Sequence, residues 1–231
     1  MSTTPTPPPA PFGPGPRTRA RRLAERASYD RETVYAILDE GLVCHLGTCA
    51  DGEPVVVPTL YVRVGDVVYL HGAPANAALG RAAGRAGDPG VVCLTVTLLD
   101  GLVMARSAFH HSVNYRSVMV FGHAVDVTDT GEKRMALAAL VEHVVPGRGQ
   151  DARPPDDQEL RATRVVKVPI EEASAKVRTG GPKDDAADLL LDIWAGEVPL
   201  AMVAGVPLAD ACAPTSPVVP AYLDAYCRAH R

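Results

Sequence analysis

Three β-rich runs separated by two tight-turn signals are the feature that most constrains the fold of this chain. The runs cover residues 42–49, 54–64 and 67–71, and the dipeptides Asp51-Gly52 and Gly65-Asp66 lie between them. Short glycine-containing connections of this kind favour β-hairpins, because glycine adopts the positive φ that two-residue turns require. The segment therefore predicts an antiparallel meander and argues against parallel strands joined by helical crossovers.

Further runs of the same kind extend the predicted sheet. Strands are expected at residues 90–99, 101–109, 115–127 and 164–170. A turn at Asp100-Gly101 is expected to join the first two of these strands. Helices are expected at residues 31–40, 75–87, 132–145, 157–161 and 219–229. Apolar residues alternate along six strands, which predicts a mainly β fold with short helices (α+β), a six-stranded antiparallel β-barrel without exposed edges.

The predicted domain lies between two segments of different composition. Residues 1–16 contain seven prolines and no apolar periodicity, and five arginines follow between residues 17 and 26. We expect residues 1–27 to form a disordered arm, because such a segment buries too little apolar surface to offset its ordering entropy. Its arginines favour a solvated helix start or a contact with a partner subunit over a contact with nucleic acid. We expect one domain over residues 28–200 and a partly helical tail over residues 201–231.

The overall composition excludes several classes of protein. The 231 residues carry 23 basic and 27 acidic side chains, and the net charge of −4 argues against a general nucleic-acid binder. No apolar run reaches the roughly 18 residues of a membrane helix, and no secretory signal is visible. The five cysteines are odd in number and form no CxxC pair, which argues against a disulfide framework and favours the reducing cytoplasm.

Two histidine positions are candidates for chemistry. His71 ends a predicted strand before Gly72 and a helix start, where free backbone N–H groups favour a phosphate; a purely structural histidine is the alternative reading. His110-His111 lie between two predicted strands in a polar stretch. They are either solvated loop residues or part of a pocket wall that includes Tyr115 or Arg116.

Several familiar catalytic and metal-binding patterns are absent or fail on geometry. The sequence contains no phosphate-binding GxxxxGK[ST] loop, no GxGxxG, no GxSxG and no HExxH. Cys44 and His45 are neighbours on one predicted strand, so their side chains point to opposite faces. Together with Cys49 they cannot converge on one metal ion, and we predict no metal site here.

Seven motifs in chain order carry a resemblance to a known family. They are YDRETVY at 29–35, PTLY at 58–61, YLHG at 69–72, TVTLLDG at 95–101, FHHSVNYRSV at 109–118, VVPGR at 144–148 and EASAKVRTG at 172–180. This series strongly resembles the pyridoxamine 5′-phosphate oxidase-related proteins of the FMN-binding split-barrel superfamily. The branch it resembles most includes the nitroimidazole-resistance reductases. The resemblance covers about residues 22–200 and implies a split barrel that forms a homodimer, with FMN at the subunit interface.

The resemblance also implies a set of site residues. The cofactor-binding residues would be Pro58, Thr59, Tyr61, His71, Gly72, Asn76, Arg81, Tyr115, Arg116, Lys176, Arg178 and Trp194. The catalytic residues would be His71 and His111, either of which can relay a proton. Lys176 or Arg178 would stabilise reduced, anionic flavin, and these late residues would approach from the other subunit.

One departure from the family pattern concerns the phosphate of FMN. Relatives commonly place a hydroxyl–cation pair after the His-Gly dipeptide, where this chain has Asn76 and Ala77. Arginine normally meets a phosphate with paired, charge-assisted hydrogen bonds. In this chain Arg81 or Arg85 would have to supply that charge from later turns of the helix.

Three functional readings remain open from the sequence. The first is an FMN-dependent oxidoreductase that acts on a small organic substrate. The alternative is a non-catalytic flavin- or haem-binding split-barrel protein, in which His110-His111 would ligate the iron. The third is a barrel whose cofactor site has decayed. Pyridoxamine phosphate oxidation itself is disfavoured, because the C-terminal region lacks the arginine-rich ending of that enzyme.

Overall fold

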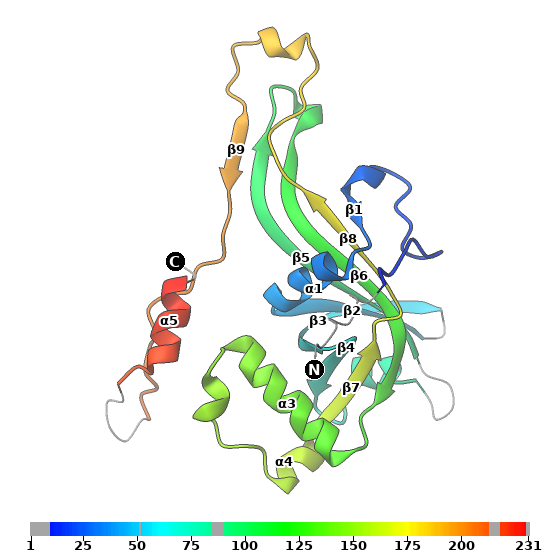
Figure 1. Ribbon diagram of the computed structural model, residues 1–231, viewed down its shortest axis with the longest axis vertical. Coiled ribbons are helices and arrows are strands. Elements are labelled where there is room, and N and C mark those ends of the chain that lie inside the picture. Colours follow the sequence, from blue (N-terminus) through cyan, green and yellow to red (C-terminus); the bar gives the residue numbers. More distant parts are fainter. Residues whose placement is uncertain (1–9, 51, 85–89, 213–217, 230–231) are drawn as a thin grey trace, which may run out of the picture.

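A ring of six antiparallel strands encloses the main core of the protein (Figure 1). The structure is a computed structural model that describes residues 10–50, 52–84, 90–212 and 218–229. The strands of the ring are β2 (Val43–Ala50), β3 (Glu53–Val64), β4 (Val67–Gly72), β5 (Gly90–Met104), β6 (Ser112–Asp126) and β7 (Arg164–Pro169). Their order is β6-β7-β4-β3-β2-β5, and β5 closes the ring by pairing with β6. The expected six-stranded, mainly β fold is confirmed.

The ring is split along β6, which changes partner near Gly122. Residues 115–121 of β6 pair with β8 (Glu172–Arg178), whereas residues 125–126 pair with β7. A Cβ atom at Gly122 would lie 2.1 Å from the carbonyl oxygen of Pro169, so only glycine fits where the chain leaves β7 for β8. This split distinguishes the ring from a smooth closed barrel.

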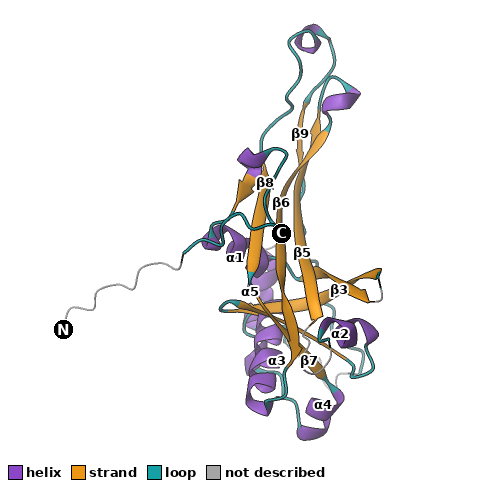
Figure 2. Cartoon of the chain, turned by 90° about the vertical axis from the view of Figure 1, so that its right-hand side faces the viewer, coloured by secondary structure: helices purple, strands orange, loops and turns teal. Residues whose placement is uncertain are grey.

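Strands β5 and β6 continue past the ring and form a projecting arm (Figure 2). We define the arm as residues 98–116 and the returning segment 178–199. Strand β9 (Gly196–Pro199) pairs with β5 inside the arm, and β1 (Ala27–Ser28) pairs with the outer edge of β8. The sequence did not predict β8 or β9, because β8 is rich in small and polar residues and β9 has only four residues.

The turn expected at Asp100-Gly101 is wrong. Strand β5 passes through this dipeptide without a break and forms a bulge there. The carboxylate of Asp100 accepts hydrogen bonds from Arg116, and a Cβ at Gly101 would lie only 3.1 Å from the carbonyl oxygen of Val198. The Asp-Gly pair therefore marks a bulge. The chain reverses later, through the short helix η2 (Ala108–His110).

Five α-helices and three further short helical turns complete the described elements. They are α1 (Arg31–Glu40), α2 (Ala77–Ala82), α3 (Thr130–Val144), α4 (Asp157–Ala162) and α5 (Ala221–Ala229), with η1 (Ala24–Arg26), η3 (Arg148–Gln150) and η4 (Asp188–Leu190). Helix α1 has its predicted bounds, because the side chain of Asp30 accepts the N–H of Thr33 as an N-cap. Helix α2 begins later than the predicted residue 75 and ends at Ala82, and residues 85–87 of the predicted helix lie outside the described residues. None of these helices is long and apolar enough to span a membrane.

Two apolar clusters hold the helices on the strands. The larger cluster fills the ring and includes Tyr61, Leu46 and Leu94, with α1 packed against it through Ile37 and Leu38. The smaller cluster lies between α3 and strands β3, β4 and β7. It consists of Val62, Tyr69, Val127, Ala136, Leu140 and Val165. Helix α3 therefore covers the outside of the ring where β4 ends.

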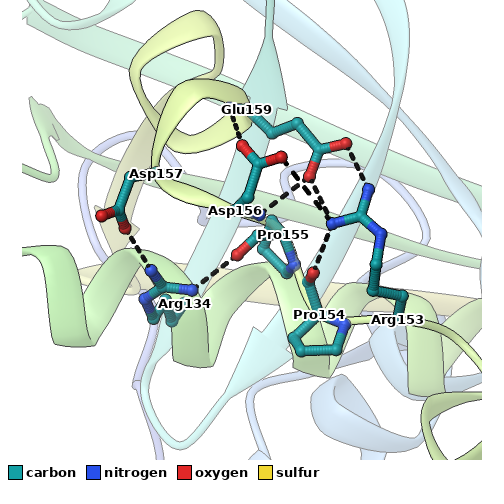
Figure 3. Close-up of polar contacts among 7 residues, drawn as sticks. All are labelled: Arg134, Arg153, Pro154, Pro155, Asp156, Asp157 and Glu159. Carbon is teal, nitrogen blue, oxygen red and sulfur yellow. Dashed lines mark hydrogen bonds and ion pairs between the residues drawn. The ribbon is translucent and has the colours of Figure 1, made fainter.

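A polar network fixes the connection between α3 and α4 (Figure 3). Asp156 caps α4 by accepting the N–H of Glu159 at 2.8 Å, and Glu159 accepts the N–H of Asp156 in return. Arg153 binds the carboxylate of Glu159 at 2.6 Å, and Arg134 on α3 binds Asp157 at 2.6 Å. The two helices are held in a fixed relation beside the ring.

The described part of the N-terminal segment lies against β6 and β8. Arg17 pairs with Glu172 at 2.7 Å, and its guanidinium lies 4.7 Å from the centre of the Phe121 ring. Thr18 is buried, and the N–H of Phe12 donates to a backbone carbonyl of residue 29 at 3.0 Å. Phe12, Arg17 and Thr18, which lie in the N-terminal segment expected to be disordered, are therefore packed against other parts of the chain, whereas residues 1–9 lie outside the described residues.

Candidate functional site

His71 ends β4 under helix α3. Its neighbours are Tyr69, Leu137, Leu140 and Val165, which line a cavity of about 10 Å³ beside it. The Nδ1 atom of His71 is buried and has no hydrogen-bond partner among the described residues. Burial lowers the pKa of the imidazole, so the ring is neutral over a wider pH range than a free histidine. A neutral ring with an unpaired nitrogen can accept or donate a proton or bind a metal.

The predicted phosphate cradle after His71 is already partly occupied by a side chain. Asn76 caps α2, and its Oδ1 atom accepts the N–H groups of Ala78 at 3.0 Å and Leu79 at 3.1 Å. Only the amide NH₂ of Asn76 remains as a donor. Arg81 is exposed and forms no ion pair within the described residues, whereas Arg85, the other expected cation, lies outside the described residues.

Gly72, next to His71, is needed for packing. A Cβ at this position would lie 2.9 Å from Leu79 Cδ1 and 3.1 Å from Asn76 Nδ2. The glycine therefore lets α2 approach the end of β4 closely. This is the strand, glycine and helix arrangement that the sequence predicted for residues 71–78.

The arm carries the His-His pair at its tip, and the two imidazoles differ in their partners. His110 Nε2 lies 3.3 Å from a carboxylate oxygen of Asp185. His111 is exposed, and its Nδ1 atom lies 2.9 Å from the carbonyl oxygen of Ser107. That carbonyl can only accept, so Nδ1 carries the proton when the ring is neutral and Nε2 presents its lone pair. Trp194, also in the arm, is 68% exposed.

Arg178 lies at the base of the arm and is buried. It donates to Asn114 Oδ1 and to the carbonyl oxygens of Gly180 at 2.8 Å and Gly181 at 3.1 Å. Asn114 donates in turn to Glu197 of β9 at 2.6 Å. This network joins β6, β8 and β9 and fixes the returning segment of the arm. Sequence reasoning did not identify Asn114 or Glu197, because their relation depends on strand pairings that were not predicted.

Arg116 joins two elements of the fold. Its Nη2 atom donates to Oε1 of Glu40, at the end of α1, at 2.7 Å and to Oδ1 of Asp100, at the bulge of β5, at 2.8 Å. These carboxylates raise the pKa of Arg116 further. Tyr115 is half-buried on β6 opposite Arg178, and Lys176 is half-buried on β8 without an ion-pair partner among the described residues.

The expected flavin-lining segment of β3 separates into different environments. Pro58 is exposed on the outside of the ring and Thr59 is half-buried. Tyr61 is completely buried in the core, and its hydroxyl donates to the carbonyl oxygen of Leu38 at 2.6 Å. Burial raises the pKa of Tyr61. As a core side chain it does not reach a surface where a cofactor can bind.

Within one chain, the expected site residues therefore form separate groups. His71, Gly72, Asn76 and Arg81 gather where β4 ends and α2 begins, at the end of the molecule opposite the tip of the arm (Figure 2). The residues of the arm lie at the other end. A larger hollow of about 420 Å³ between α3 and α4 is lined by none of the expected site residues.

A ring of six antiparallel strands that splits at one strand, with a histidine at a strand end before a short helix, defines a split-barrel protein. The chain belongs to the pyridoxamine 5′-phosphate oxidase family, whose model matches residues 30–177. No curated protein matches the chain. Some solved structures match a larger part of the chain than the family model does.

Two solved structures resemble almost the whole chain. The flavocytochrome Anf3 from Azotobacter vinelandii is 39% identical, with 93% of this chain and 98% of that chain covered and a TM-score of 0.85. The FAD and haem binding protein from Mycobacterium smegmatis is 32% identical, with 87% and 96% covered and a TM-score of 0.81. A protein from Bacteroides thetaiotaomicron named for 5-nitroimidazole antibiotic resistance is 26% identical, with 65% and 86% covered and a TM-score of 0.55.

Proposed function

We propose that this chain is a flavin- and haem-binding oxidoreductase that works as a homodimer on a small-molecule substrate. One observation carries the proposal: its likeness to the flavocytochrome and to the FAD and haem binding protein covers 93% and 87% of the chain, well beyond residues 30–177. The nitroimidazole-resistance protein matches only 65% of the chain. Much of the chain outside residues 30–177 is thus also matched by a protein named as a flavocytochrome and by one named for FAD and haem binding.

His71 is the described residue that best fits a place beside the flavin. Its buried Nδ1 atom lacks a partner, and Gly72 and Asn76 shape the turn that follows it. Arg81 and Lys176 have no ion-pair partner among the described residues, so their charges are available to a phosphate and to reduced flavin. The remaining proposed flavin contacts are Pro58, Thr59, Tyr115 and Trp194. Tyr61, Arg116 and Arg178 are left out because the core or the arm already engages them.

His111 fits a haem ligand better than His110 does. The carbonyl oxygen of Ser107 fixes the proton on Nδ1 of His111, which leaves Nε2 to bind iron. This arrangement is common in metal-binding histidines, whose second nitrogen donates to a backbone carbonyl or a carboxylate. In His110 the nitrogen that would bind the iron already faces Asp185.

The proposed dimer follows from the small space that the described part of one chain offers beside His71. The cavity beside His71 has room for about one water molecule, whereas cofactor pockets span roughly 300–1,000 Å³. The tip of the arm exposes large apolar side chains, with Phe109 88% and Leu190 89% exposed. Patches of this kind mark interaction sites. A second chain would cover them and complete the site.

In the proposed reaction the bound flavin and haem supply the electron transfer, and the side chains position and protonate. His71 would hold or pass a proton at Nδ1, because its lowered pKa keeps the ring neutral. Lys176 would place a positive charge near the flavin, where reduction adds negative charge. The apolar side chains of the arm would exclude water from the completed site.

Absorption spectroscopy of the purified full-length protein tests this proposal. We expect both a flavin band and a haem Soret band, with about one of each cofactor per chain, and chromatography of the extracted flavin then distinguishes FMN from FAD. The variant His71→Ala should retain haem and lose flavin reduction by a chemical donor, while His143→Ala, whose imidazole is engaged by Gly41, serves as the control. Absence of both cofactors would contradict the proposal. Bound cofactors without electron transfer to any acceptor would favour a non-catalytic binding protein.

A further inference from the structure

His45 lies on the outside of the ring, at the centre of a four-stranded surface. Its neighbours along β2, Cys44 and Leu46, are buried in the core, and His45 is exposed on the opposite face, as the sequence predicted. On one side the Cα partner of His45 is Pro58 of β3, and on the other side it is Thr95 of β5. We call the outward surface of β3, β2, β5 and β6 around His45 the β2 face.

The β2 face is largely apolar although the single chain leaves it exposed. Its residues around His45 are Val43, Val56, Pro58, Leu60, Thr95 and Met119. Val56 is 63% exposed, and Val43 and Leu60 are also exposed. Gly47 lies two residues beyond His45 on the same face. Because glycine has no side chain, nothing projects from the sheet at this position. Four strands at about 4.8 Å spacing make this surface roughly 14 Å wide, enough for a flat macrocycle.

The imidazole of His45 has no hydrogen-bond or ion-pair partner in the described part of the chain, which sets it apart from His110, His123 and His143. His123 contacts Glu171 at 2.8 Å, His110 contacts Asp185 and His143 contacts the carbonyl oxygen of Gly41. An imidazole with both nitrogens unengaged, in the middle of an apolar surface, offers a lone pair in the surroundings that a porphyrin prefers.

Positive charge lies at the edge of the same surface. Arg17 of the N-terminal segment packs on Phe121 of β6, whose Cα partner on β5 is Cys93, opposite Gly47 of β2. Arg19 and Arg21 follow in the chain, are exposed and have no ion-pair partner among the described residues. Arg17, which also pairs with Glu172, thus places a guanidinium beside the β2 face, and a guanidinium complements the two carboxylates at the edge of haem.

We propose that His45 is an axial ligand of haem iron, with the macrocycle lying against the β2 face. This rests on the proposed function and names the site of its haem. The other axial position remains for His111, which must then come from the second chain. Within one chain, the strand from Thr95, beside His45, to the end of β5 separates the two imidazoles by roughly 30 Å.

Haem titration of the variant His45→Ala tests the proposal. The wild type, His45→Ala and His123→Ala are prepared as full chains, freed of haem and titrated with haemin. Affinity is measured from the Soret band, and axial ligation is measured by electron paramagnetic resonance. We expect His45→Ala to bind haemin at least tenfold more weakly and to lose an imidazole signal. His123→Ala, which removes a paired histidine from the same sheet, should match the wild type.

Two additions separate ligation from a merely structural effect. Free imidazole should restore the wild-type spectrum of His45→Ala, and His45→Met should retain haem with a changed spectrum and a higher reduction potential. Wild-type affinity and spectrum in His45→Ala, or no rescue by imidazole, would overturn the assignment and leave the proposed function standing; in that case the β2 face serves only as a contact with the second chain. A wild-type protein that binds no haemin would overturn both.

Discussion

The Nζ atom of Lys167 lies 2.9 Å from each carboxylate oxygen of Glu132, which ties the first turn of α3 to β7. The hydroxyl of Tyr69 on β4 donates to the same carboxylate at 2.9 Å. Lys167 and then Tyr69 lower the pKa of Glu132, while burial and the carboxylate raise the pKa of Tyr69 to about 12. Tyr69 and His71 both line the small cavity under α3. The carboxylate of Glu132 therefore helps to keep α3 in place above His71.

Replacing Glu132 by Gln should lower the free energy of unfolding by about 1 kcal/mol near neutral pH, because a partly exposed charged hydrogen bond is lost. A carboxyl whose pKa is lower in the folded state contributes stability above its unfolded pKa of about 4.5. That contribution disappears as the pH falls through the folded-state pKa. Urea denaturation from pH 7 down to pH 3 should therefore show the two proteins converging at the acid end. A difference that stays constant over this range would contradict the assigned cause.

The elements that follow local rules were predictable from the sequence. Helix α1 has its predicted bounds because Asp30 provides the cap and Val34, Ile37 and Leu38 form one apolar face. The hairpins around Gly52 and Gly65 form as expected, because both glycines adopt the positive φ that their turns require. These features depend on residues within one or two turns of each other.

Several features that depend on contacts between distant parts of the chain were not predictable. Asp100-Gly101 has the composition of a turn, but β9 and Arg116 reach it from distant parts of the chain and make it a bulge. Arg116 and Arg178 carry charges that suit a cofactor. In the structure, however, a carboxylate binds Arg116 and a backbone carbonyl oxygen binds Arg178, and the sequence alone does not show these contacts. Of the expected site, His71 with Gly72 and Asn76 was placed correctly as a strand end and helix start, because that relation is local.

A substitution of Tyr61 tests whether this side chain stabilises the core or binds the flavin. The variant Tyr61→Phe leaves the carbonyl oxygen of Leu38 without its buried donor. We expect it to lose about 1–3 kcal/mol of unfolding free energy, with flavin content per chain unchanged. Chemical denaturation and the flavin-to-protein absorbance ratio measure the two effects. Loss of flavin at unchanged stability would return Tyr61 to the cofactor site.

Ala77 tests the proposed source of charge for the flavin phosphate. It is exposed at the first position of α2, beside an Asn76 whose oxygen is already engaged. The variant Ala77→Arg should tighten FMN about tenfold, because a charged hydrogen bond exceeds a neutral one by roughly 1.4 kcal/mol. Riboflavin, which lacks the phosphate, is the control ligand and should bind as before. Unchanged FMN affinity would show that another cation, such as Arg81, already meets the phosphate.

Substitutions of Arg178 test whether the arm forms part of the dimer interface. Its buried guanidinium satisfies three acceptors, from Asn114, Gly180 and Gly181, and so holds the segment that leads to Trp194. The variant Arg178→Ala leaves these acceptors unpaired and frees the returning segment, whereas Arg178→Lys keeps the charge without the planar fork and should be intermediate. Trp194 is the single tryptophan of the chain, so its emission reports on the arm alone.

In the dimer of the wild type, Trp194 should be shielded from water and emit at shorter wavelength than the exposed ring of a single chain. Arg178→Ala should shift this emission to longer wavelength and weaken dimerisation at least tenfold, because the arm must be ordered again on association. Sedimentation velocity over a dilution series gives the dissociation constant on the same samples. The ring below the arm should keep its circular dichroism, since its core is independent of Arg178. If Arg178→Ala dimerised like the wild type with unchanged emission, the arm would not be part of the dimer interface. The expected site residues of the arm would then not be brought to His71 of the second chain by this interface.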